Sequence, residues 1–144
     1  MVATPHFYVE PTVLVGTVEV QCHISMVTLI PEVTWGDVET YCNPGGEAPT
    51  RISWRGVMRL RMSYGTDSSW ELFASLDPTT PTDMTIWPGD AGTDFAGSSE
   101  NPSADFQAYI APLPFIPEHE VGASATFDIE FRVVGEPVFD DGTT

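Results

Sequence analysis

The sequence predicts a mainly β fold, a β-sandwich or barrel with one short flanking α-helix, and three alternating segments carry that prediction. Residues 17–29, 51–64 and 125–134 each alternate apolar and polar side chains with a two-residue period. This period is typical of a strand with one buried face, whereas a helix would scatter the apolar residues around its circumference. With 144 residues the chain is long enough to bury one core, so we expect residues 1–144 to form a single domain.

The alternation assigns a face to each residue of these segments. Gly56 interrupts the second segment and predicts a bulge or the close approach of another backbone. The side chains expected to face the core are Val18, Val20, Cys22, Ile24 and Met26 in the first segment, Ile52, Trp54, Met58, Leu60, Met62 and Tyr64 in the second, and Phe127, Ile129, Phe131 and Val133 in the third.

Two shorter strands are expected over residues 82–87 and 104–110, and residues 12–15 form a weaker third candidate. Their alternation has the same two-residue period as the long segments. The residues expected to point inward are Met84, Ile86, Ala104, Phe106, Ala108 and Ile110.

One helix is expected over residues 69–76. Ser68 and Glu71 have the spacing of a capping box, in which each side chain satisfies a backbone N–H of the first turn. Trp70, Phe73 and Ala74 share one face at helical spacing.

The remaining segments predict loops and flexible ends. Residues 43–46 are a turn cluster, and residues 88–102 are rich in Gly, Ser, Asp and Pro and read as a flexible insertion. Residues 112–120 carry three prolines. An N-terminal arm over residues 1–11 and a tail over residues 140–144 are expected to be flexible.

The charge balance excludes several partners. Asp and Glu number 21 against five basic residues, all of them arginine, which gives a formal net charge of −16. Such a chain repels nucleic acid and anionic membranes, and its apolar runs are too short to span a membrane. No secretory signal is visible, so we expect Cys22 and Cys42 to be reduced and structural.

The sequence contains no catalytic motif, and we expect neither an enzyme nor a cofactor. His119 between Glu118 and Glu120 could suggest a metal, but neighbours in an extended segment point to opposite sides. A second acidic group in the Gly-rich loop could bind calcium, but its spacing misses the EF-hand pattern. That group is Asp90, Asp94 and Glu100. We therefore expect no metal site.

Four of the five arginines form a stripe on the second alternating segment. In a chain so rich in carboxylates, we expect this stripe to form cross-strand or intersubunit Arg–carboxylate pairs rather than to bind a ligand. The candidates for subunit contacts are Arg51, Arg55, Arg59 and Arg61, together with the loops 43–50 and 88–102.

The order of these elements resembles a known family. The strand SWRGVMRLRMSY, the helix SSWELFASL and the strand DMTIWP are followed by a Gly/Ser/Pro loop, the strand ADFQAYIAPL and the closing stretch ATFDIEFRVVGEPVFDD. Over residues 12–140 this order is similar to major tail tube proteins of long-tailed, siphovirus-type bacteriophages. The closing alternating aromatic strand, followed by Val133–Pro137 and a short polar tail, is the most suggestive part.

The resemblance implies a structural virion protein, made in the host cytoplasm. In that family six subunits form a ring, rings stack into a tube with other tail proteins, and DNA passes through an acidic lumen without specific binding. A carboxylate-lined wall would repel the DNA phosphates, so the DNA would pass without being retained by the wall. The lumen candidates are polar-face strand residues: Glu19, Gln21, Asp105, Gln107, Asp128 and Glu130.

Two other classes of protein remain open. Capsid decoration proteins, tail terminators and head–tail connectors are also small acidic β domains of the virion. An immunoglobulin-like binding module, for carbohydrate, would need a stacking platform from Trp35, Trp54, Trp70 and Trp87, but Trp54 and Trp70 lie on predicted apolar faces.

Overall fold

The described residues form one seven-stranded sheet and one short helix. The computed structural model describes residues 11–20, 23–40, 43–91, 95–116 and 125–143. The strand order is β2-β1-β5-β6-β7-β4-β3, and every neighbouring pair is antiparallel. The elements are β1 Thr12–Val15, β2 Val18–Glu19, β3 Ile24–Thr40, β4 Asn43–Arg61, α1 Ser69–Ala74, β5 Thr82–Trp87, β6 Ser103–Ile110 and β7 Thr126–Asp140. The predicted mainly β fold with one short helix is confirmed.

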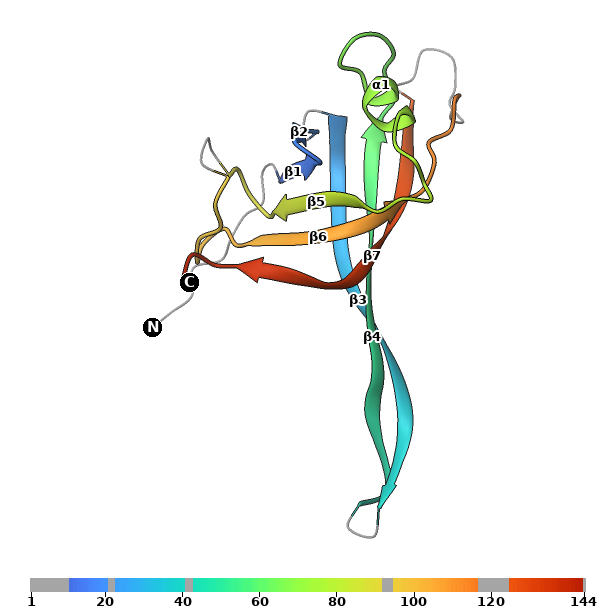
Figure 1. Cartoon of the computed structure of the whole chain (residues 1–144), viewed down its shortest axis with the longest axis vertical. Coiled ribbons are helices and arrows are strands. Elements are labelled where there is room, and N and C mark those ends of the chain that lie inside the picture. Colours follow the sequence, from blue (N-terminus) through green and yellow to red (C-terminus); the bar gives the residue numbers. More distant parts are fainter. Residues whose placement is uncertain (1–10, 21–22, 41–42, 92–94, 117–124, 144) are drawn as a thin grey trace.

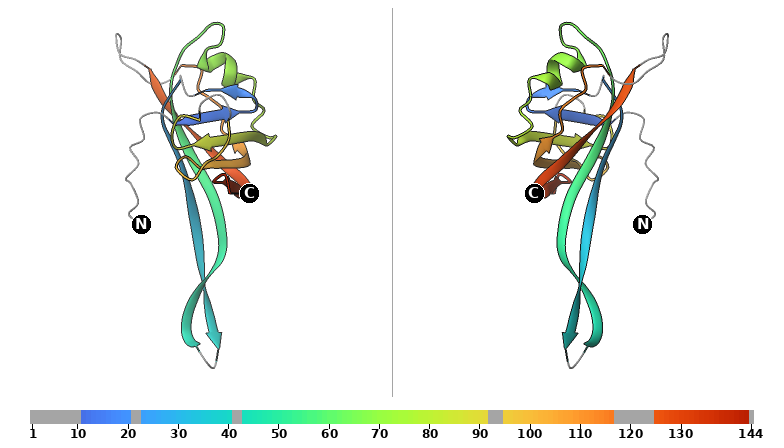
Figure 2. Two further views of the ribbon diagram at one scale, coloured as in Figure 1. Left: turned by 90° about the vertical axis from the view of Figure 1, so that its left-hand side faces the viewer. Right: turned by 90° about the vertical axis from the view of Figure 1, so that its right-hand side faces the viewer.

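The sheet folds over on itself into two layers whose strands cross steeply (Figures 1 and 2). The first layer contains β3, β4 and residues 126–132 of β7, and the second contains β1, β2, β5, β6 and the rest of β7. β7 passes from one layer to the other where its register against β6 shifts, and Gly135 lies in this irregular stretch with φ 77°. A glycine in the left-handed region lets the strand turn this corner.

The core lies between the two layers. Phe106 of β6 and Phe131 of β7 stack at its centre, with ring centroids 5.7 Å apart. Around them pack Val13, Val15, Val20, Met58, Leu60, Phe73, Met84, Ile86, Ala104, Ala108, Ile110 and Ile129, all buried. The inward residues predicted on β5 and β6 are all among them. On β7, Ile129 and Phe131 are buried, and Phe127 and Val133 pack partly buried against the cluster.

The first alternating segment is not one strand. β2 ends at Glu19, His23 N donates a hydrogen bond to Val20 O at 2.9 Å, and β3 begins at Ile24. The register then shifts between Ile24 and Met26, so Met26 lies opposite Arg59 on the outer face. One extra residue in a strand reverses the face of every later side chain, so the predicted inward position of Met26 is wrong. Val27, opposite Met58, points inward instead.

The turn predicted at residues 43–46 and the loop over residues 43–50 are instead part of a long hairpin. β3 continues to Thr40, and β4 begins at Asn43 and pairs with it along its whole length. The hairpin extends well beyond the two layers (Figure 1). Prolines and glycines argue against a strand in the interior of a sheet, but a two-stranded hairpin tolerates them.

The predicted helix cap is present in a slightly different form. Ser68 Oγ accepts a hydrogen bond from Glu71 N at 3.2 Å, as in a capping box. The Glu71 carboxylate accepts from the N–H of Asp67 rather than of Ser68. The helix ends at Ala74, with Ser75 as its C-cap, and Ala74 is exposed whereas Phe73 is buried.

Replacing Ser68 with alanine should lower the free energy of unfolding by about 1 kcal/mol, the usual cost of a lost N-cap. The change removes both the bond to Glu71 N and the bond that Ser68 Oγ donates to Gly65 O at 2.8 Å. Chemical denaturation measures the difference. Ser68→Thr keeps an acceptor oxygen and should therefore retain most of the free energy of unfolding that Ser68→Ala loses. An equal loss of free energy in the two variants would contradict a capping role.

The loop after β5, predicted to be a flexible insertion, is tied to the body at its described residues. Trp87 Nε1 donates to Ala96 O at 3.3 Å, and the Asn101 side chain accepts from Gly89 N at 2.7 Å and donates to Asp90 O at 3.1 Å. Residues 1–10 of the N-terminal segment, which was predicted to be flexible over residues 1–11, lie outside the described residues.

Candidate assembly surface

All five arginines of the chain lie on one face of the first layer. Arg51, Arg55, Arg59 and Arg61 alternate along β4 with the buried Met58 and Leu60, and therefore point away from the core. Arg132 of β7 lies directly opposite Arg55 on the same face. Over residues 24–34, 51–61 and 126–132 this surface carries five arginines and three carboxylates, and we call it the arginine face.

Each carboxylate of the arginine face is paired with an arginine. Asp128 accepts two bonds from Arg59, at 2.9 Å from Nε and 3.4 Å from the terminal nitrogen, and this pairing raises the pKa of Arg59. Oε1 of Glu32 lies 2.6 Å from Nε of Arg55, and Oε1 of Glu130 lies 3.0 Å from a terminal nitrogen of Arg132. The predicted pairing of the stripe is therefore realised within the chain for two of its four members. Because these side chains are about half exposed, the pairs add little stability.

The six lumen candidates do not share one surface. Asp128 and Glu130 lie on the arginine face, and Gln21 is outside the described residues. Asp105 and Gln107 point outward from the second layer, where Thr85 Oγ1 donates to Asp105 at 2.6 Å and Gln107 donates to Asp83 at 3.0 Å. Glu19 lies on β2, opposite Leu14.

The first layer has a free backbone edge on each side. Among the described strands, β3 pairs only with β4, so its other edge is open along its length. On the opposite side, residues 126–129 of β7 pair with β4 alone, because pairing with β6 begins only at Phe131 and Ala111 N bonds Glu130 O. Open edges of this length are templates for pairing with another chain.

The projecting hairpin, which we call the arm (residues 31–54), carries an exposed apolar face. Val33 lies opposite Ile52, and Trp35 follows two residues along β3 on the same side. Their exposed fractions are 39%, 47% and 60%. At the base of the arm the ring of Trp54 contacts Phe139, with centroids 5.6 Å apart. Apolar side chains gathered on a projecting element mark a contact surface.

The described residues contain no group of three or more His, Cys, Asp and Glu that could hold a metal. The trio around His119 lies outside them. No helix in the described part of the chain is long and apolar enough to cross a membrane.

The four tryptophans do not line up as a stacking platform. Trp87 is buried, Trp54 contacts Phe139, and Trp70 packs against Tyr64 and Phe115. Trp35 stands on the arm.

Sequence comparison finds neither a family model nor a curated protein that matches the chain. Comparison of structures does find matches. A chain of the PVC sheath–tube complex of an extracellular contractile injection system, solved by cryo-electron microscopy in the extended state, superposes with a TM-score of 0.68. The fold is that of a tail tube protein. The identity is 14%, over 95% of this chain and 92% of the other.

A chain of the PVC sheath/tube terminator, also in the extended state, gives a TM-score of 0.69. Its identity is 15%, over 97% of this chain and 99% of that one. One chain of the sheath–tube complex and one chain of the sheath/tube terminator therefore share this fold with the present chain over nearly its whole length.

Proposed function

We propose that the protein is a structural tube protein of a phage-tail-like particle, whose copies close side by side into rings that stack into a tube. The pair of free edges on the first layer carries this proposal, and the shared fold supports it. A layer that is open on both sides can be continued by a copy of itself on either side. Closing the series into a ring pairs the free edge of β7 in each copy with part of the β3 edge of the next.

In this ring, β3 of one copy lies beside residues 126–129 of β7 in the next. β3 and β7 are both antiparallel to β4, so they run in the same direction, and rotation about an axis along the strands brings them together as a parallel pair. Six copies is the number that the resemblance to tail tube proteins implies. The arm would then project along the tube toward a neighbouring ring.

The arginine face would line the bore. The core, the second layer and α1 all lie on the other side of the first layer (Figure 2). When a sheet closes into a barrel, its inner side has less room than its outer side, so the bulk of each copy must lie outside. Asp128 and Glu130 would face the bore, whereas Asp105, Gln107 and Glu19 would face outward.

Such a bore carries five arginines against three carboxylates per copy, so it is not acidic, and this bears on DNA as the proposed cargo. Free arginines would retain DNA by releasing its counterions. Here three of the five arginines form ion pairs with Glu32, Asp128 and Glu130. Arg51 and Arg61, which form no ion pair with any described residue, stand at the two ends of the stripe. We propose that these two pair with carboxylates of neighbouring copies.

Replacing Asp128 with alanine should raise the affinity of the protein for DNA. The change leaves Arg59 without its carboxylate and free to contact phosphate. Fluorescence anisotropy of a labelled duplex at several salt concentrations measures the effect. Each arginine that gains a phosphate contact should add about −0.9 to the slope of log affinity against log salt.

The control for this experiment is the double change Arg59→Ala with Asp128→Ala, which removes the freed arginine as well. It should bind DNA no better than the unchanged protein. Equal DNA binding by the single and the double variant would show that Asp128 does not shield Arg59 from phosphate.

A tail terminator is the second candidate, because the terminator complex gives a TM-score as high as the tube complex. Electron microscopy of the purified protein in negative stain separates the two. Tubes of stacked rings at high concentration support the tube protein, and single rings that never stack support a terminator. A monomer at every concentration would overturn both.

A further inference from the structure

The arm carries two carboxylates that lie side by side toward its tip. Asp37 of β3 is directly opposite Glu47 of β4, and both side chains are exposed. Neither forms an ion pair with any residue that the structure describes. Like charges directly opposite each other in an antiparallel pair repel, so a cation supplied by another molecule would stabilise the arm at this point.

The opposite end of β4 carries the complementary charge beside exposed aromatic rings. β4 ends at Arg61, whose exposed side chain forms no ion pair with the described residues. The chain continues to Tyr64, whose ring packs against Trp70 and Phe115. The exposed fractions of Tyr64 and Phe115 are 55% and 62%. Ser69 Oγ donates to Arg61 O at 2.9 Å and holds the start of α1 against β4. We call Arg61 and the three rings the α1 end.

We propose that the arm of one copy docks on the α1 end of a copy in the next ring. Arg61 lies beside Asp37 and Glu47 in this contact, and Trp35 lies against the rings of the α1 end. The inference rests on the proposed stacking of rings. The arm and α1 stand at opposite ends of the molecule (Figure 1), so copies that point the same way along a tube bring each arm to the α1 end of the next copy.

The charged and aromatic groups follow one another in the same order on the two surfaces. In the arm, Trp35 is two residues nearer to the body than Asp37. At the α1 end, Tyr64 is three residues beyond Arg61, past the end of β4. Moving one copy along the strands therefore brings both pairs of groups together at once. From Glu47 to Arg61, β4 covers about 46 Å at the rise of a strand, and tilted strands span less height, so we expect a ring repeat of about 46 Å or less.

The surroundings of the two surfaces are compatible with this contact. Asp67 and Glu71 also belong to the region of α1, but they line a hollow between the helix and Val15 and Val18 of β1 and β2. Trp70 packs instead against the rings of the α1 end. The two strands of the arm cross each other in Figures 1 and 2, and this strong twist turns the tip relative to the rest of the first layer.

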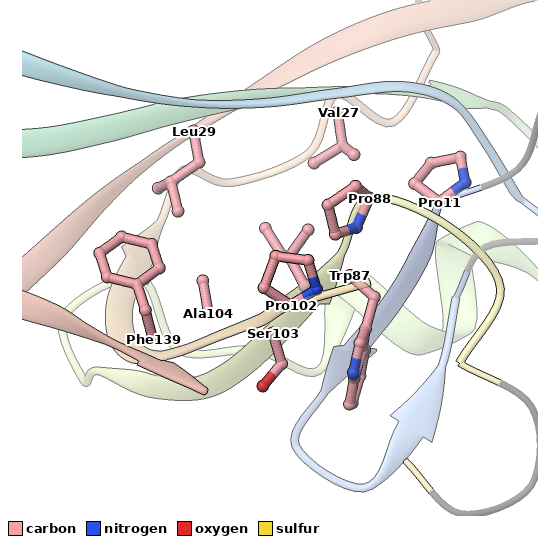
Figure 3. Close-up of a pocket in the computed structure, with 10 residues that line it drawn as sticks. Pro11, Val27, Leu29, Trp87, Pro88, Pro102, Ser103, Ala104 and Phe139 are labelled. Carbon is pink, nitrogen blue, oxygen red and sulfur yellow. The ribbon is translucent and has the colours of Figure 1, made fainter. Parts of the chain in front are cut away.

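The groove between the two layers is a second apolar surface that could receive an arm (Figure 3). Its walls include Val27 and Leu29 of β3 and Phe139 of β7, and none of its described lining residues is charged. Phe139 also contacts Trp54 at the base of the arm of its own chain. The groove therefore offers no cation to the two carboxylates of the tip, whereas the α1 end does.

The test exchanges the charges across the contact and follows assembly by light scattering and electron microscopy over a concentration series. Arg61→Glu should raise the concentration at which rings stack into tubes by at least about tenfold, because a small repulsion is repeated at every copy of a ring. Single rings should still form, since the edges of β3 and β7 are unchanged. Arg61→Glu with Glu47→Arg should restore stacking to within about threefold of the unchanged protein.

The matched control is Arg61→Glu with Glu136→Arg, which has the same net charge as the exchanged pair. Glu136 is exposed and lines the same outer hollow as Asp105 and Gln107, away from both surfaces of the contact. This control should not restore stacking. Equal restoration by both double variants would assign the effect to net charge and overturn the proposal, as would normal tubes from Arg61→Glu alone.

The aromatic half of the contact is tested by a double-mutant cycle of Trp35→Ala and Phe115→Ala, with circular dichroism to check that each variant is folded. If the two rings touch across the contact, the double variant should raise the stacking concentration no further than the more severe single variant. Effects of the two changes that simply multiply would overturn the proposal.

The behaviour of the unchanged protein separates this proposal from the proposed function. If it forms rings and tubes while the charge exchange fails, the docking of the arm on the α1 end is overturned and the tube remains. If it stays monomeric at every concentration, the proposed function is overturned and the docking with it.

Discussion

Replacing Gly56 with alanine should destabilise the chain by about 3 kcal/mol or more, the upper range for forcing extra atoms into a packed core. Gly56 pairs with Leu29 of β3 on one side and with Phe131 of β7 on the other. A Cβ at this position would overlap both the carbonyl oxygen of Thr28 and the ring of Phe131. Phe131 is fully buried and stacked on Phe106, so the ring has no space into which to move.

Denaturant unfolding followed by tryptophan fluorescence measures this loss. Gly36→Ala in the arm is the matched control, because the three atoms nearest to the added Cβ there all belong to the side chain of Thr50, and its methyl group is the nearest. Rotation of that exposed side chain would break the hydrogen bond that Thr50 Oγ1 donates to Thr34 O at 3.0 Å, so Gly36→Ala should lower the free energy of unfolding by about 1 kcal/mol, well below the loss at Gly56. Equal stability of the Gly56 and Gly36 variants would contradict the close packing of β3, β4 and β7.

Replacing Trp35 with alanine should raise the protein concentration needed for tube assembly by about thirtyfold or more, while the fold stays intact. Trp35 is 60% exposed in the single chain, so little of the folded structure depends on it. A buried aromatic anchor at an interface is worth about 2 kcal/mol or more when truncated. This energy corresponds to about thirtyfold in an association constant.

Light scattering and sedimentation over a concentration series measure this effect, and circular dichroism checks that the variant is folded. Val138→Ala is the control, because Val138 is 67% exposed but lies on the outer face of the second layer, away from the arm. Unimpaired assembly of the Trp35 variant would remove the arm's apolar face from the contacts between copies.

The sequence predicted the strands that form the core, because their alternation is regular. β5, β6 and residues 126–133 of β7 place every predicted apolar residue inward, and the capping spacing of Ser68 and Glu71 located the helix start. The face of Met26 was predicted wrongly, because a one-residue register shift leaves no mark in the residue types around it. The close approach at Gly56 was predicted and is present.

The arm was missed because residues 31–50 contain Pro31, Gly36, Pro44, Gly45, Gly46 and Pro49, which normally argue against strands. The pairing of Arg59 with Asp128 follows from strand register, which a single sequence does not contain. The alternation assigns the polar residues of each strand to an outward face. It does not say to which of the two layers a strand belongs, because that depends on how the strands pair. Asp105 and Asp128 therefore looked alike in the sequence, yet lie on different layers.

The closure of the first layer into a bore is tested most directly by cryo-electron microscopy of assembled tubes at a resolution that traces the strands. We expect β3 of each copy beside residues 126–129 of β7 in the next, with Arg55, Arg59 and Arg132 facing the axis. A bore lined by Asp83, Asp105 and Gln107, with the arginine face turned outward, would contradict this account.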